Sequence, residues 1–200
     1  VPKLKDPAET ARLIEAKDFS GDLLLSEVNE RLVKVLQMAD YLTPKYHVVV
    51  ANPPYMGSGN MNPTLKKWIG SYYDSSKADL YAAFIERSLK LIRPKAYLGM
   101  VTMQTWMFLT SLVKLRNSVL NDHSITGFMQ IGYNSFPELN SKVALAAAFI
   151  INARCRGKWG IFLNLNDAPQ SADKKAVFLQ KQAEEEFYLR KSDDFRNIPN

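Results

Sequence analysis

The chain has 200 residues, of which 46% are hydrophobic and 23% charged, and it carries a net charge of +6. These proportions are those of a globular protein with one sizeable core, and they exclude a disordered tail, a collagen-like fibre and a disulfide-stapled mini-protein. A single cysteine, Cys155, cannot form an internal disulfide, and no apolar run approaches the roughly 20 residues of a membrane span, so we expect a cytoplasmic protein.

The first elements in chain order are a helical segment and a short strand. Residues 1–45 form a helical lead-in, in which apolar residues at three- and four-residue spacing predict a helix over 20–40. Residues 46–51 are a run that is apolar but for His47 and rich in β-branched residues, and it stops at two prolines after Asn52. Such a run is typical of a buried parallel strand ending at the carboxyl edge of a sheet. The glycine- and serine-rich residues 56–76 predict a long loop.

Helices and strands continue to alternate beyond that loop. The same patterns predict helices over 78–92, 109–121 and 172–190 and strands over 96–103, 125–131, 143–151 and 159–165. This order indicates an α/β fold with a right-handed parallel sheet, whose functional site lies beyond the carboxyl ends of the strands. We therefore divide the chain into the lead-in, a body over 46–165, and a charged helical C-terminal segment over 166–200.

The tetrapeptide Asn52-Pro53-Pro54-Tyr55 carries the strongest chemical signal. The exocyclic amine of a nucleobase is a poor nucleophile, because its lone pair is delocalised into the ring. The side-chain oxygen of Asn52 and the carbonyl of Pro53 offer two adjacent acceptors for its N–H groups, which would localise that lone pair. The proline rings fix the backbone, and Tyr55 offers a face on which a flipped base stacks. A Pro-Pro turn that merely ends the strand is the alternative.

This tetrapeptide resembles the catalytic motif of S-adenosylmethionine-dependent amino methyltransferases, above all the adenine-N6 DNA enzymes. Further segments resemble the helix, strand and late motif that follow in that family: residues 79–85, 91–94, 98–106 and 134–137. Longer strings are similar to the adenine-specific methyltransferases of BREX-type phage defence and of type IIG restriction-modification systems: residues 49–57, 60–63 and 101–109.

The resemblance implies a partial Rossmann-like class I methyltransferase fold. It would comprise the C-terminal half of the sheet, mixed with a late antiparallel strand and preceded by a helical N-terminal segment. The catalytic residues implied are Asn52, Pro53, Pro54 and Tyr55. Tyr55 and Phe136 would bind the substrate base, while Phe84 and Asn52 would lie against the cofactor, S-adenosyl-L-methionine. Packing in the core explains Phe84 equally well, because this residue also falls on the apolar face of its helix.

The main cofactor-binding motif of that family is missing from the sequence. The family places a strand, a glycine-containing turn and an acidic residue before the catalytic motif, whereas Gly21 is the only glycine before Gly57. We therefore expect a fragment that is inactive alone and binds the cofactor weakly or not at all. The strand over 46–51 would leave an open apolar edge, so we also expect self-association.

The positive charge is concentrated in the body of the chain. Residues 41–160 hold 14 Lys and Arg against 5 Asp and Glu, whereas residues 1–40 hold 6 against 8 and residues 161–200 hold 6 against 7. A basic body suits a polyanion, because Lys and Arg near phosphates release condensed counterions. A basic globular protein without a nucleic-acid partner explains the charge alone equally well. His47 and His123 are isolated, so no metal site is expected.

The leading hypothesis is methyl transfer from S-adenosylmethionine to adenine N6 of a flipped base in double-stranded DNA. The resemblance places this reaction in phage defence or restriction-modification and implies partner proteins of a defence system. One alternative is a methyltransferase for another amine: cytosine N4, an RNA adenine or a protein glutamine. The other is a non-catalytic module that interacts with DNA.

Overall fold

The computed structural model describes the chain except for residues 1–5, 18–20, 22, 134, 136–144, 170 and 198–200. The chain divides into two compact units, Val1–Lys45 and Tyr46–Asn200. Among the described residues, no helix combines the length and the apolar character that crossing a membrane requires.

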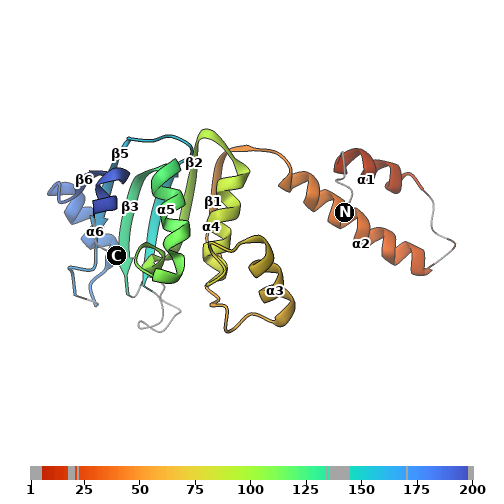
Figure 1. Cartoon of the computed structure of the whole chain (residues 1–200), viewed down its shortest axis with the longest axis horizontal. Coiled ribbons are helices and arrows are strands. Elements are labelled where there is room, and N and C mark those ends of the chain that lie inside the picture. Colours follow the sequence, from red (N-terminus) through yellow and green to blue (C-terminus); the bar gives the residue numbers. More distant parts are fainter. Residues whose placement is uncertain are drawn as a thin grey trace. The chain divides into compact units, whose positions relative to one another are not determined.

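The first unit is a pair of helices, α1 (Pro7–Glu15) and α2 (Leu23–Leu42), which pack against each other (Figure 1). Asp6 caps α1, because its side chain accepts a hydrogen bond from the backbone N–H of Glu9. The apolar spacing of α2 follows the sequence prediction, and the helix extends two residues beyond the predicted end.

The second unit is built on a six-stranded sheet with the order β1-β2-β4-β3-β5-β6. The bounds of its strands are Tyr46–Ala51, Ile92–Met103, Ser124–Gly132, Ala146–Asn152, Trp159–Asn164 and Tyr188–Lys191 for β1 to β6. The pairs β1–β2 and β3–β5 are parallel, while β4 runs antiparallel between β2 and β3. The predicted α/β fold with a late antiparallel strand is therefore confirmed, although the sheet is mixed and not wholly parallel.

Helices cover one face of this sheet. The helices α4 (Leu80–Leu91) and α5 (Val113–Asp122) lie in front of the strands in Figure 1. Beneath them is the hydrophobic core, whose fully buried members include Leu98, Trp106, Ile125 and Ile151. Burying such side chains away from water is the main source of stability in a fold of this size.

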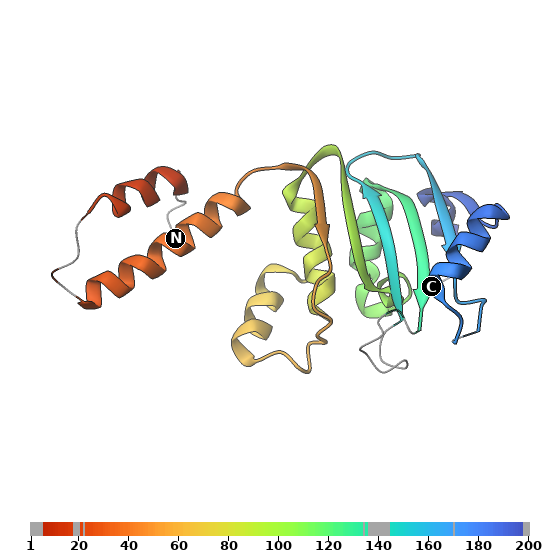
Figure 2. The ribbon, with the colours of Figure 1, turned by 180° about the vertical axis from the view of Figure 1, so that it is seen from behind.

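The opposite face of the sheet is largely bare within the second unit. Figure 2 shows β2, β4 and β3 from this side with no helix in front of them, and α6 (Lys174–Ala183) stands beside β5. Because side chains alternate between faces along a strand, apolar residues also point here. Val50 is 76% exposed and Ile150 47% exposed. β1 pairs parallel with β2 and ends the strand order of the described sheet, so the predicted parallel strand with an open edge is confirmed. The prediction that this strand is buried is wrong, because none of its six residues is buried.

The predicted loop over 56–76 contains a helix, α3 (Pro63–Tyr72). Asn62 caps it by accepting a hydrogen bond of 2.8 Å from the N–H of Leu65, and Pro63 occupies its first turn. An asparagine followed by a proline is a known helix-start signal, but the neighbouring glycines obscured it.

The predicted helix over 172–190 is too long. The helix α6 ends at Ala183, where Glu185 adopts a positive φ of 55° that a helix cannot continue through. The chain then forms β6, which pairs antiparallel with β5, so the segment after residue 165 contributes a strand to the same sheet. Among the described residues, short 3₁₀ turns also lie at Gln104–Met107, Thr110–Leu112 and Ser192–Asn197.

Candidate active site

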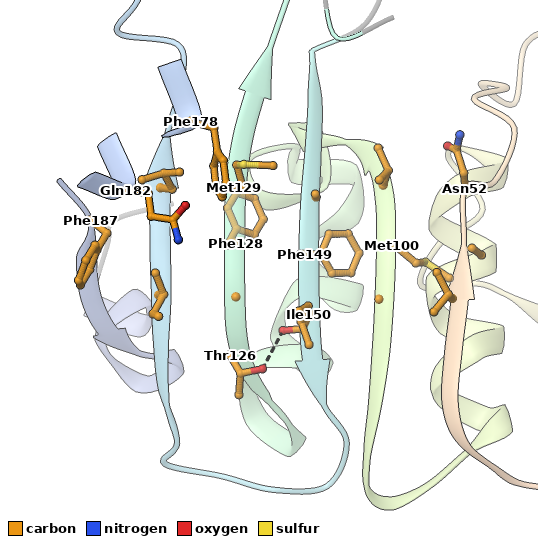
Figure 3. Close-up of a pocket in the computed structure, with 18 residues that line it drawn as sticks. Asn52, Met100, Thr126, Phe128, Met129, Phe149, Ile150, Phe178, Gln182 and Phe187 are labelled. Carbon is orange, nitrogen blue, oxygen red and sulfur yellow. Dashed lines mark hydrogen bonds between the residues drawn. The ribbon is translucent and has the colours of Figure 1, made fainter. Parts of the chain in front are cut away.

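The tetrapeptide lies where the sequence predicts it, directly beyond the carboxyl end of β1. Pro53 is buried and anchors the turn, whereas Asn52 and Pro54 are exposed and Tyr55 is half-buried. Figure 3 shows the Asn52 amide standing at the end of its strand. An exposed amide oxygen beside a fixed proline is accessible to a hydrogen-bond donor that arrives from outside.

Contacts of Tyr55 and Tyr81 connect this turn to the rest of the fold. The Tyr55 hydroxyl donates a long hydrogen bond of 3.4 Å to Asn52 Oδ1. The ring of Tyr55 meets that of Tyr81 edge-on, with centroids 6.1 Å apart. The hydroxyls of Tyr81 and Thr105 are 3.1 Å apart, which links the first turn of α4 to the segment after β2. Burial raises the pKa of Tyr81 to about 12, and it also raises the pKa of Tyr55, so both rings stay neutral near pH 7.

Asp79 ties the chain that follows the tetrapeptide to the start of α4. Its Oδ1 accepts hydrogen bonds from the N–H groups of Met56 at 3.0 Å and Tyr81 at 3.2 Å. The N–H of Leu80 also donates to the carbonyl of Met56 at 3.0 Å. Burial raises the pKa of Asp79, and these backbone donors oppose that rise. Asp79 thus positions the turn, a role that the sequence prediction missed although an aspartate before a helical run signals a cap.

Two of the predicted site residues have different outcomes. Phe84 lies between buried neighbours on α4 but is itself 40% exposed, so it is not a core residue in this chain. Its ring is available to a flat ligand. Phe136, predicted to contact the substrate base, lies outside the described residues.

A large apolar hollow of about 890 Å³ occupies the bare face of the sheet. Figure 3 shows its lining, in which Asn52 stands at one margin. The remaining lining comes mainly from small and apolar residues, among them Val50, Gly99, Gly127 and Ile150. Such a lining suits packing against apolar groups.

The histidines fit structural roles. Over the described ranges, no three His, Cys, Asp or Glu side chains gather in a way that would hold a metal ion. His123 is buried, and its Nδ1 accepts a hydrogen bond of 2.9 Å from the N–H of Arg154. Burial lowers the pKa of His123, which keeps the ring neutral near pH 7.

Residues 7–136 match the family model described as Eco57I restriction-modification methylase. The chain is 33% identical over 172 residues to a protein from Lacticaseibacillus casei named adenine-specific methyltransferase PglX. The matched region covers 84% of the chain and 14% of that relative. It is 30% identical over 180 residues to the Escherichia coli adenine-specific methyltransferase BrxX, and this match covers 90% of the chain and 15% of that relative. The chain thus spans about a seventh of the length of these curated relatives.

Solved structures share its fold at low sequence identity. A protein of a type I restriction-modification system has a TM-score of 0.59 and 14% identity over 78% of the chain and 36% of its own length. A Listeria monocytogenes protein assigned to the class I S-adenosylmethionine-dependent methyltransferases has a TM-score of 0.52 and 15% identity over 76% of the chain and 49% of its own length.

Proposed function

This chain belongs to the Eco57I restriction-modification methylase family, and from that premise we propose that it carries the amine-activating part of an enzyme that methylates adenine N6 in DNA. The observation that supports the proposal is the exposed turn at Asn52–Tyr55, held at the carboxyl end of a parallel strand. Ligand sites of α/β sheets lie at such ends.

The two acceptors of the turn match the two N–H groups of an adenine amine. Asn52 Oδ1 and the Pro53 carbonyl each accept one of them, and the amine nitrogen recovers its lone pair as its geometry becomes tetrahedral. The hydrogen bond from Tyr55 to Asn52 is long, at 3.4 Å, so a stronger donor displaces it at small cost. Tyr55 then presents its ring to the flipped base while Tyr81 supports that ring from the edge.

The half-exposed ring of Phe84 and the exposed amide of Asn52 would contact a flat, polar methyl donor, S-adenosylmethionine, whose main binding motif is missing from this sequence. When bound against Phe84 and Asn52, this cofactor would supply an electrophilic methyl group for the amine nitrogen. Asn52 and Pro53 hold the two N–H groups until one proton leaves to water. Tyr55, neutral near pH 7, places no negative charge beside the reacting nitrogen.

The proposal is tested on the full-length protein that contains this chain, incubated with labelled S-adenosylmethionine and, in parallel reactions, with unmethylated genomic DNA, RNA or protein. We expect label in N6-methyladenine. If the label is instead in N4-methylcytosine, in RNA or in a protein glutamine, that acceptor is the substrate and adenine in DNA is not. If no acceptor is labelled and the protein still binds DNA, the protein is a non-catalytic interaction module and the proposal is wrong.

A further inference from the structure

The helix α3 presents an exposed surface beside the candidate active site. The views in Figures 1 and 2 agree that α3 lies near the end of β1 from which the tetrapeptide leaves. A second hydrophobic cluster holds it there, formed by Met61, Ile69, Tyr73 and Ala83 with Met56 packed against them. Because Met56 follows Tyr55 directly, α3 is anchored to the chain that carries the tetrapeptide.

The exposed surface of α3 carries aromatic rings on one flank, where Trp68 also contacts Tyr73 of the cluster with ring centroids 5.4 Å apart, and lysines outside that flank. Trp68 and Tyr72 are four residues apart and therefore share one side of the helix, with ring centroids 5.5 Å apart. Trp68 is 49% exposed and Tyr72 65% exposed. Lys66 and Lys67 are exposed as well, and neither has an acidic partner in the part of the chain that the structure describes.

The charge of this segment favours an anionic partner. Residues 52–73 contain two lysines and no acidic residue. The nearest carboxylate in the sequence, Asp74, is already engaged by Lys77 at 2.6 Å and Lys114 at 2.9 Å. Lys66 and Lys67 are therefore exposed, and no carboxylate within residues 52–73 offsets their charge. The neighbouring aromatic rings supply flat apolar surface.

From this placement we propose that α3 docks on double-stranded DNA next to the target adenine, with Lys66 and Lys67 on the phosphate backbone and Trp68 against the bases exposed when the adenine leaves the stack. The inference rests on the proposed function and adds the surface that holds the substrate. Phosphate contacts supply affinity without sequence preference, and an aromatic ring stacks on any base. Tyr72 extends the ring surface of Trp68.

The test uses the full-length protein with Lys66→Ala/Lys67→Ala and Trp68→Ala, bound to a short mixed-sequence duplex and assayed on unmethylated genomic DNA. We expect the double lysine variant to lower the slope of log Kd against log salt by about 2, since each lost phosphate contact contributes roughly 0.9. We expect Trp68→Ala to raise the KM for DNA about tenfold with a smaller change in kcat.

Matched controls are Lys175→Ala on α6 and Trp159→Ala on β5, which change exposed residues of the same types away from α3. If the α3 variants behave like these controls while the wild-type protein methylates DNA, the α3 proposal is wrong and the proposed function stands. If the wild-type protein does not methylate DNA, the proposed function fails, and the salt slope still decides whether α3 contacts the duplex. Should Trp68→Ala unfold, the exposed lysine variant decides alone.

Discussion

The helix-covered face of the sheet is stabilised by buried side chains, whereas the turn at the carboxyl end of β1 is positioned mainly by hydrogen bonds. On the covered face, Leu98 and Ile151 are completely buried under the helices α4 and α5. In the turn, Asn52 and Pro54 are exposed, and the backbone directly after it is held by hydrogen bonds between Met56 and the residues Asp79 and Leu80. Asn52 is thus separate from the side chains that stabilise the fold, whereas Tyr55 also packs against the core. Substitutions of core residues and of Asn52 should therefore divide into two classes.

Ile151→Ala should have the largest effect on stability. It removes a fully buried side chain and leaves a cavity, so we expect a loss of about 2–5 kcal/mol in the free energy of unfolding, measured by urea denaturation. The matched control is Ile150→Ala on the same strand, whose side chain points to the bare face and is 47% exposed. It should cost about 1 kcal/mol or less. Equal losses would contradict the assignment of the two faces.

Asp79→Ala should have an intermediate effect, because Asp79 links the turn to α4. The variant loses the acceptor for Met56 N–H and the cap of the helix, so we expect a loss of about 1 kcal/mol in unfolding free energy. Asp79→Asn keeps an oxygen acceptor and should recover most of it. If Asp79→Ala unfolds at the same urea concentration as the wild-type chain, the bracing role is wrong.

The raised pKa of Asp79 predicts a pH dependence. The folded state holds the proton more tightly than the unfolded state, so this group favours folding below the ordinary aspartate pKa, and its contribution declines as pH rises through the raised value. The stability of Asp79→Asn relative to the wild-type chain should therefore increase between pH 4 and neutrality. Paired urea titrations measure it, and a relative stability that falls over this range would contradict the burial of the carboxylate.

Asp74→Asn should have the smallest effect on the fold. Hydrogen bonds from Lys77 and Lys114 lower the pKa of Asp74 to about 2, but the group is exposed and solvent screens its ion pairs. Its small stabilising contribution is present at neutral pH and is lost as pH falls toward 2. We expect a slight fall in the thermal midpoint at low salt, which disappears in concentrated salt. A large fall that persists in salt would show that Asp74 has a core role.

The sequence predicted the elements whose signals are local. The apolar run over 46–51 and the prolines that stop it identified β1 and the turn correctly. The helix α3 was missed because the glycines around it resemble a loop, and β6 was missed because Glu184–Glu186 continue a charged helical pattern. The late antiparallel strand was predicted only through the family resemblance, and the strand order was not predicted, since β4 inserts between β2 and β3 through pairings distant in sequence. The missing cofactor motif indicated an open edge at β1, but the exposure of Val50 on the face of the sheet depends on neighbours in space that no local pattern records.

The most direct test of the account combines activity and stability in one variant, Asn52→Ala, made in the full-length protein. We expect N6-methyladenine formation on unmethylated DNA to fall by at least about a hundredfold, because one of the two amine acceptors is lost. Its unfolding midpoint should match that of Asn60→Ala, an exposed asparagine in the same segment that should retain full activity. Undiminished methylation by Asn52→Ala, or a loss of activity accompanied by unfolding, would contradict the claim that this exposed turn performs the chemistry.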